Sequence, residues 1–217
     1  MGSLTRKFAN NFTTGGVYKP AAITNNSLAN ITDIPAAAKG KLTLISSQTA
    51  SASASISFTS GIDSTYPIYR FEFINIHGTV DTDFQFQGSI NGGSSYGVTI
   101  TSTSHRAYHN ESDTATALQY QAGSDLAQST SYQHLSECGT ANDMNTSGSL
   151  LLFNPSSTTF VKHWISNFNF VNDSNYSINI YHAGYFNTTN SINALTFRMS
   201  SGNIDAGTIK LYGIKDS

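Results

Sequence analysis

The stretch Ile68-Tyr69-Arg70-Phe71-Glu72-Phe73-Ile74-Asn75-Ile76-His77 is the clearest structural signal in the sequence. Its residues alternate with a period of two, which is the period of side chains along a β-strand. Ile68, Arg70, Glu72, Ile74 and Ile76 would share one face, and Tyr69, Phe71, Phe73, Asn75 and His77 the other. Both faces carry apolar residues, so the stretch predicts a central strand with neighbours on both sides.

Similar short alternating segments lie before and after this stretch. They include Leu42 to Leu44, Ile56 to Phe58, Phe84 to Phe86, Tyr96 to Ile100, Leu150 to Phe153, Phe160 to Phe170, Tyr176 to Ile180, Ala194 to Met199 and Thr208 to Ile214. The Asn91-Gly92-Gly93 step predicts a hairpin between its two flanking segments. Residues 200–207, with two glycines, predict a turn that pairs the last two segments. Residues 104–147 are polar and predict long loops or short edge strands.

About ten short strands with no convincing helix predict an all-β protein. At 217 residues, one antiparallel jelly-roll-like β-sandwich is the natural architecture. The aromatic content of 12% argues against intrinsic disorder. No apolar run reaches the roughly 18 residues that span a membrane, so no membrane partner is expected.

The sequence changes at residue 41 both in charge and in its pattern of polar and apolar residues. Residues 1–41 hold five basic residues and one acidic residue, whereas the remainder holds six basic and twelve acidic residues. Such an asymmetry suggests an interaction arm, predicted over 1–40, ahead of a sandwich over 41–217. The alternative is an ordinary chain end without fixed structure. The expected anchors of the arm on a partner are Arg6, Lys7, Phe8, Phe12, Val17, Tyr18 and Ile23.

The Ser, Cys, His and Asp residues form no recognisable catalytic motif. No Gly-x-Ser-x-Gly elbow or phosphate-binding glycine loop occurs, and Cys138 is the single cysteine. His105 and His109 are too few to form a metal site, and Asp81 and Asp83 are interpreted as turn residues. We therefore expect no enzyme activity, no cofactor and no metal. The acidic body also makes nucleic-acid binding unexpected.

Four tyrosines in or beside the irregular middle segment are candidate contact residues: Tyr96, Tyr108, Tyr120 and Tyr132. Exposed aromatic side chains on the loops of a rigid β-scaffold are suited to holding sugars or protein partners. Packing and self-association are the alternatives for these residues.

Several segments resemble virion proteins of tailed bacteriophages, especially aquatic ones. The resemblance lies in Met199 to Ile214, Phe153 to His163, Ile56 to Ile76 and the arm motifs Thr13 to Val17 and Asn25 to Leu28. It implies a structural virion protein, such as a capsid decoration protein or a head or tail fibre, that is jelly-roll-like and often trimeric. The expected partners are other virion proteins and two further copies of the chain. The alternatives are a tail-fibre module that contacts host glycans and, third, a depolymerase.

Overall fold

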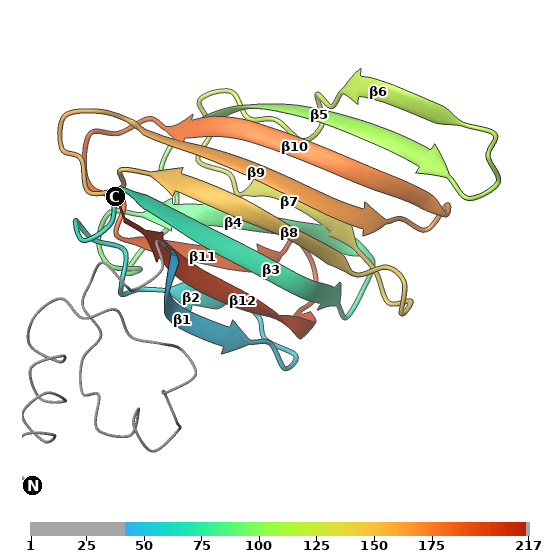
Figure 1. The fold of residues 1–217 in the computed structure, drawn as a ribbon, viewed down its shortest axis with the longest axis horizontal. Coiled ribbons are helices and arrows are strands. Elements are labelled where there is room, and N and C mark those ends of the chain that lie inside the picture. Colours follow the sequence, from blue (N-terminus) through green and yellow to red (C-terminus); the bar gives the residue numbers. More distant parts are fainter. Residues whose placement is uncertain (1–41, 216–217) are drawn as a thin grey trace, which may run out of the picture. The chain divides into compact units, whose positions relative to one another are not determined.

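The structure, a computed structural model, describes residues 42–215. They form twelve strands in two antiparallel sheets that pack as a sandwich (Figure 1). The eight-stranded sheet has, in spatial order, β1 (Leu42–Thr49), β12 (Ile204–Ile214), β3 (Ile68–Gly78), β8 (Thr146–Phe153), β9 (Lys162–Val171), β10 (Tyr176–Phe186), β5 (Ile100–Asn110) and β6 (Thr116–Tyr120). The four-stranded sheet has β2 (Ile56–Phe58), β11 (Ala194–Met199), β4 (Thr82–Ser89) and β7 (Gln133–Cys138). The predicted all-β antiparallel sandwich is confirmed.

Eight of the strands have jelly-roll connectivity. The order β1-β12-β3-β8 in the large sheet is matched by β2-β11-β4-β7 in the small sheet. The links β1 to β2, β3 to β4, β7 to β8 and β11 to β12 each cross from one sheet to the other. The other four strands, β9, β10, β5 and β6, extend the large sheet alone, and the small sheet's last strand, β7, packs mainly on β9. One end of the large sheet therefore has no facing sheet.

This connectivity overturns two predicted hairpins. The Asn91-Gly92-Gly93 step reverses the chain, with positive φ at both glycines, but it links β4 of the small sheet to β5 of the large one. Likewise β11 and β12 lie in different sheets, although a turn separates them. Turn residues specify a reversal, whereas burial of the apolar faces decides which strand becomes the partner.

The middle segment is more regular than its composition suggested. Residues 104–147 contain most of the eleven-residue strand β5, the edge strand β6 and the buried strand β7. Polar side chains do not prevent strand formation here, because β5 pairs with β10 along its full length. The predicted edge strand is present as β6, and a predicted long loop is present as residues 121–132.

A β-bulge corrects the face assignment in β3. Tyr69, Phe71 and Phe73 point into the sandwich, as the alternation predicts. Asn75 then adopts a φ of +50°, and the pairing with β8 shifts between Phe73 and Ile76. The extra residue reverses the alternation, so Ile76 is fully buried instead of facing outward.

The core between the sheets is built from phenylalanine rings. Phe197 of β11 lies at its centre, with ring centroids 5.0 to 6.3 Å from those of five other rings: Phe58, Phe71, Phe73, Phe84 and Phe86. Most of these contacts are edge-to-face or tilted, as aromatic pairs prefer. The only tryptophan, Trp164, is fully buried against Phe86 at 5.0 Å.

Candidate functional site

The seven predicted arm anchors, Arg6, Lys7, Phe8, Phe12, Val17, Tyr18 and Ile23, lie outside the described residues. The four predicted tyrosines lie within them and occupy separate environments. Tyr132 is on a loop, whereas Tyr108 lies in β5 and Tyr120 ends β6, so the loop placement of these two is wrong. Tyr96 is also on a loop, because the alternating segment Tyr96 to Ile100 is strand only from Ile100 onward. The strands of Tyr108 and Tyr120 form because β10, β5 and β6 pair successively.

Each tyrosine has its own contacts. Tyr132 lies under the Arg198 guanidinium, 3.6 Å from the ring centroid, and Tyr120 donates a hydrogen bond to Asp125. Tyr108 packs edge-to-face on Tyr176 at 5.3 Å. Tyr96 lines a recess of about 340 Å³ beside the Gly97 to Thr99 segment. The four rings therefore do not form one common binding surface.

The outward face of strands β9, β10, β5 and β6 carries exposed aliphatic and aromatic side chains among uncharged polar ones such as Asn167 and Asn179. Cross-strand pairing places Ile165 beside Ala183, His105 beside both Tyr181 and Tyr120, and Ala107 beside Leu118. Directly paired residues in an antiparallel sheet share a face. We call the set Ile165, Tyr181, His105, Ala107, Leu118 and Tyr120 the outer patch.

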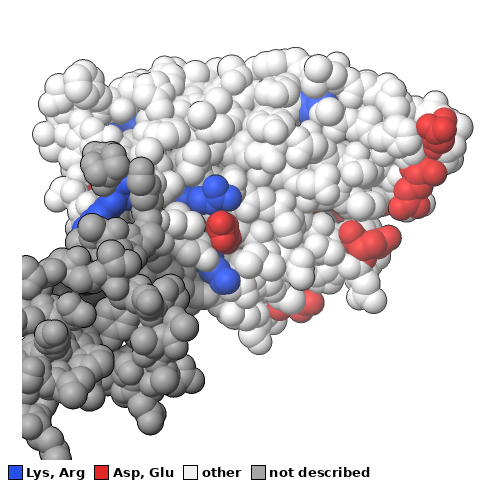
Figure 2. Space-filling view, viewed as in Figure 1, with Lys and Arg blue, Asp and Glu red and all other residues white. Residues whose placement is uncertain are grey.

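The outer patch is exposed and uncharged. Leu118 is 75% exposed, Tyr120 56%, Ile165 46% and Tyr181 43%. The His105 and Tyr181 rings stack nearly parallel at 5.3 Å. By strand alternation, the outward-facing residues of these four strands include no Lys, Arg, Asp or Glu. Figure 2 shows this side of the large sheet almost free of charge.

The few charges on the rest of this face lie together around Glu72. Arg70 Nε donates to Glu72 Oε1 at 3.1 Å along β3, so these two residues share a face, as the alternation predicts. Lys210 of β12 is paired in register with Glu72. At the other edge of the sheet, Leu42 and Leu44 of β1 are also exposed, at 46% and 54%.

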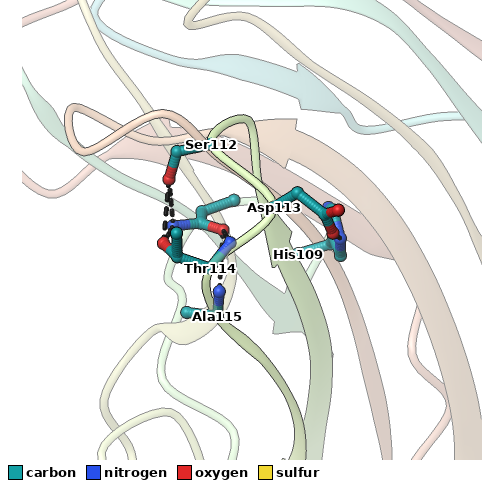
Figure 3. A network of polar contacts seen from close by, with 6 residues as sticks. His109, Ser112, Asp113, Thr114 and Ala115 are labelled. Carbon is teal, nitrogen blue, oxygen red and sulfur yellow. Dashed lines mark hydrogen bonds and ion pairs between the residues drawn. The ribbon is translucent and has the colours of Figure 1, made fainter.

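The β5–β6 hairpin ends in a polar network that fixes its tip (Figure 3). The Asn110 Oδ1 atom accepts hydrogen bonds from the backbone N–H groups of Thr114 and Ala115, both at 2.9 Å. Its Nδ2 donates to the hydroxyls of Ser112 and Thr114 at 2.8 and 2.7 Å. One buried amide therefore organises the tip from within, while the exposed His109 Nε2 contacts Asp113 Oδ1 at 3.0 Å on the outside.

A buried polar cluster lies between β7 and the inner face of β9, β10 and β5. His182 is flanked in register by Ser104 and Ser166, and its ring lies 5.6 Å from that of His134. Within residues 42–215, seven buried atoms here have no hydrogen-bond partner: the hydroxyls of Ser104, Ser136 and Ser166, Trp164 Nε1, His134 Nδ1 and both ring nitrogens of His182. Burying such groups without partners costs free energy.

Burial controls the protonation of both histidines in this cluster. Burial, with His134 and His105 nearby, lowers the pKa of His182 to about 3. Burial also lowers the pKa of His134, against the opposing attraction of Asp83, whose Oδ1 lies 3.7 Å from Nε2. Both rings are therefore neutral at pH 7.

The remaining reactive side chains, Cys138 and Lys162, are buried, and Lys162 is also hydrogen-bonded. Burial raises the pKa of the Cys138 thiol far above its ordinary value, so it is protonated at neutral pH. Lys162 is fully buried, and its ammonium donates to the carbonyls of Phe160 and Thr188 at 2.6 and 3.1 Å. Among residues 42–215, no three His, Cys, Asp or Glu side chains converge as a metal site would require.

Two recesses lie on either side of the β9–β10 turn. One, of about 230 Å³, is lined by Asp81, Asp83, Glu137 and Asp173, with Thr82, Cys138 and Met144. The other, of about 250 Å³, is lined by Arg106, Tyr108, Asn172, Ser174, Tyr176 and Ile178. Sequence reasoning singled out only Tyr108 as a contact residue of the second recess, because the others become neighbours through pairing of β5 with β10.

Comparison with known proteins finds no family model, no curated protein and no solved structure that matches the chain. In the part of the chain that the structure describes, a search for helices long and apolar enough to cross a membrane finds none.

Proposed function

We propose that this chain is a non-enzymatic structural protein of a bacteriophage virion, a subunit that self-associates through the outer patch of its large sheet. The observation that carries the assembly role is the outer patch itself. Isolated exposed apolar residues are common on protein surfaces, but exposed aliphatic and aromatic side chains across four neighbouring strands, with no Lys, Arg, Asp or Glu among them, are typical of an interaction site.

The low charge of this surface favours a second copy of the chain as the occupant. An interface core is depleted in charge and enriched in aromatic residues, as the outer patch is. A neighbouring copy that covers the patch removes no Lys, Arg, Asp or Glu side chain from water, because the patch contains none. Closed cyclic symmetry would cover the patch on every copy, and a trimer is the state that the phage resemblance suggests.

The virion location rests on the resemblance of segments such as Phe153 to His163, and the anchoring role of residues 1–40 on their excess of basic and apolar residues. In this proposal, the arm attaches the sandwich to the capsid or to a head or tail appendage. The copy number in purified particles separates the two alternatives: a fixed stoichiometric ratio to the major capsid protein indicates decoration, whereas a few copies per particle indicate a receptor-binding fibre.

The assembly role is tested by the mass of the purified full-length chain in solution. Light scattering coupled to size exclusion is expected to give about 70 kDa for three copies of the 23.3-kDa chain. Ile165→Lys combined with Leu118→Lys places a charge on two outer strands of the patch and should shift the protein to monomer. Val80→Lys is the matched control, because Val80 is 39% exposed but lies in the loop after β3.

A monomeric wild-type chain at concentrations well above micromolar would contradict the self-association proposal. So would an unchanged oligomer in the double variant. The Val80→Lys control excludes a general effect of an added lysine on the hydrodynamic behaviour.

A further inference from the structure

The large sheet leaves part of its inner face without a facing sheet. The small sheet ends at β7, which lies against Ser102 of β5 and His182 of β10, so β6 beyond them has no facing strand within residues 42–215. At one end of β5 the gap is closed by a loop, since Ser102 exchanges hydrogen bonds with Leu126 at 2.8 and 2.9 Å. At the other end, near the right-hand end of β10 in Figure 1, the inner face opens into the recess lined by Arg106, Tyr108 and Tyr176.

The residues at these core-facing positions are amphipathic rather than apolar. Tyr108 and Tyr176 are half-buried and meet edge-to-face, so each ring retains an accessible part beside the recess. The Arg106 guanidinium lies 5.6 Å from the centroid of the Tyr108 ring, and with the Gln119 amide turned it donates to Gln119 Oε1 at 3.1 and 3.2 Å. A fixed planar donor beside two aromatic rings can hold a ligand that has both C–H faces and hydroxyl groups.

The β9–β10 turn, which also lines the recess, is held by hydrogen bonds. Asn172 Oδ1 accepts hydrogen bonds from the backbone N–H groups of Ser174 and Tyr176 at 3.2 and 3.1 Å, which fixes the β9–β10 turn. The volume of about 250 Å³ is enough for one sugar ring and its hydroxyl groups. A preformed recess avoids the free-energy cost of ordering a loop when the ligand binds.

The charges around the recess argue against an anionic ligand. Burial raises the pKa of the neighbouring Glu137, and the Arg106 guanidinium opposes that rise, so the two side chains interact. Asp173 lies on the same turn as Asn172, and Glu111 and Asp113 lie at the nearby hairpin tip. Figure 2 shows acidic side chains gathered at this end of the sandwich. The single arginine is thus outnumbered by carboxylates.

We propose that this recess binds an uncharged sugar residue of a glycan. The Tyr108 and Tyr176 rings would contact the C–H face of the sugar, and the Arg106 guanidinium would donate hydrogen bonds to two adjacent hydroxyl oxygens. A single sugar ring offers few atoms, so the dissociation constant of one site is about a few millimolar. This inference is independent of self-association, because it concerns the opposite face of the sheet.

The experiment is saturation-transfer NMR on the full-length chain with methyl glycosides of glucose, galactose and mannose, and with glucuronic acid. At least one neutral glycoside is expected to receive saturation, and the acidic sugar to receive less. Arg106→Gln should weaken binding at least tenfold. Ser174→Trp, at an exposed turn position whose backbone hydrogen bond is retained, should block the recess without disturbing the core.

Arg198→Gln is the matched control, since Arg198 also lies over a tyrosine, Tyr132, but neither residue lines the recess. Its binding should equal that of the wild type. Absence of saturation transfer to every neutral glycoside would overturn the proposal. Binding that survives both Arg106→Gln and Ser174→Trp would overturn it as well, and tighter binding of glucuronic acid would refute the assignment to an uncharged sugar.

Discussion

Acidification should destabilise the sandwich through His182, which is 1% exposed. Its pKa is about 3 in the folded chain, against 6.5 for an unperturbed histidine. The unfolded chain therefore binds a proton below pH 6.5 that the folded chain does not bind. The free energy of unfolding must then fall as the pH falls from 6.5 towards 3, and be regained as the pH rises.

The magnitude follows from the proton balance. Between pH 7 and pH 5 the unfolded state takes up nearly one proton at His182, which costs about 2 kcal/mol of stability. Continuing to pH 3 brings the total to about 4 kcal/mol, a large part of the stability of an ordinary domain. His134, whose pKa is also lowered by burial, acts in the same direction.

Urea denaturation at pH 7, 6 and 5, at one protein concentration, measures this loss through the fluorescence of the single, buried Trp164. His182→Gln removes the titrating group. Its loss of unfolding free energy between pH 7 and pH 5 should therefore be about 2 kcal/mol smaller than that of the wild type. His163→Gln is the control, because His163 is exposed and is not among the groups that shift the pKa of His182. A wild-type free energy of unfolding that is constant from pH 7 to 5, or an equal loss in His182→Gln, would refute the reasoning.

Three further changes test the packing and the hairpin. Phe197→Ala removes the central ring of the core and should lower the free energy of unfolding by about 3–5 kcal/mol in urea denaturation. Asn110→Ala removes four hydrogen bonds at the β5–β6 tip, and amide hydrogen exchange should accelerate at Thr114 and Ala115 while the core stays protected. Cys138 should react with a thiol reagent at least tenfold faster in urea than in buffer, because the folded chain buries it and keeps it protonated.

The wrong hairpins show where local patterns stop being informative. Gly92 and Gly93 determine that the chain reverses, and the alternation of Phe84 and Phe86 determines that the preceding segment is a strand. Neither determines that β4 pairs with β11 and β7 in one sheet while β5 joins β10 in the other. That choice depends on contacts between residues more than a hundred positions apart, such as Thr196 with Gln87.

The candidate sites illustrate the same limit. Tyr108 could be singled out as an aromatic residue, but its neighbours Tyr176 and Arg106 become visible only when β10 and β5 pair. Leu118 lies in a polar segment, and nothing in the sequence around it indicated a contact role. Its role in the proposal comes from its position beside Ala107 in the outer patch. His182 offers no sequence cue to its burial, which follows from the position of β7 over β9 and β10.

The sequence by itself determined that this chain is an all-β protein, because side-chain alternation is a local property of each strand. It also determined the low charge that makes an uncharged sheet face possible. The tertiary structure alone decided which strands share a sheet, that a bulge at Asn75 turns Ile76 inward, and that four further strands extend the large sheet alone. The physical reason is that pairing and burial are collective: each segment's free energy depends on surfaces supplied by distant parts of the chain.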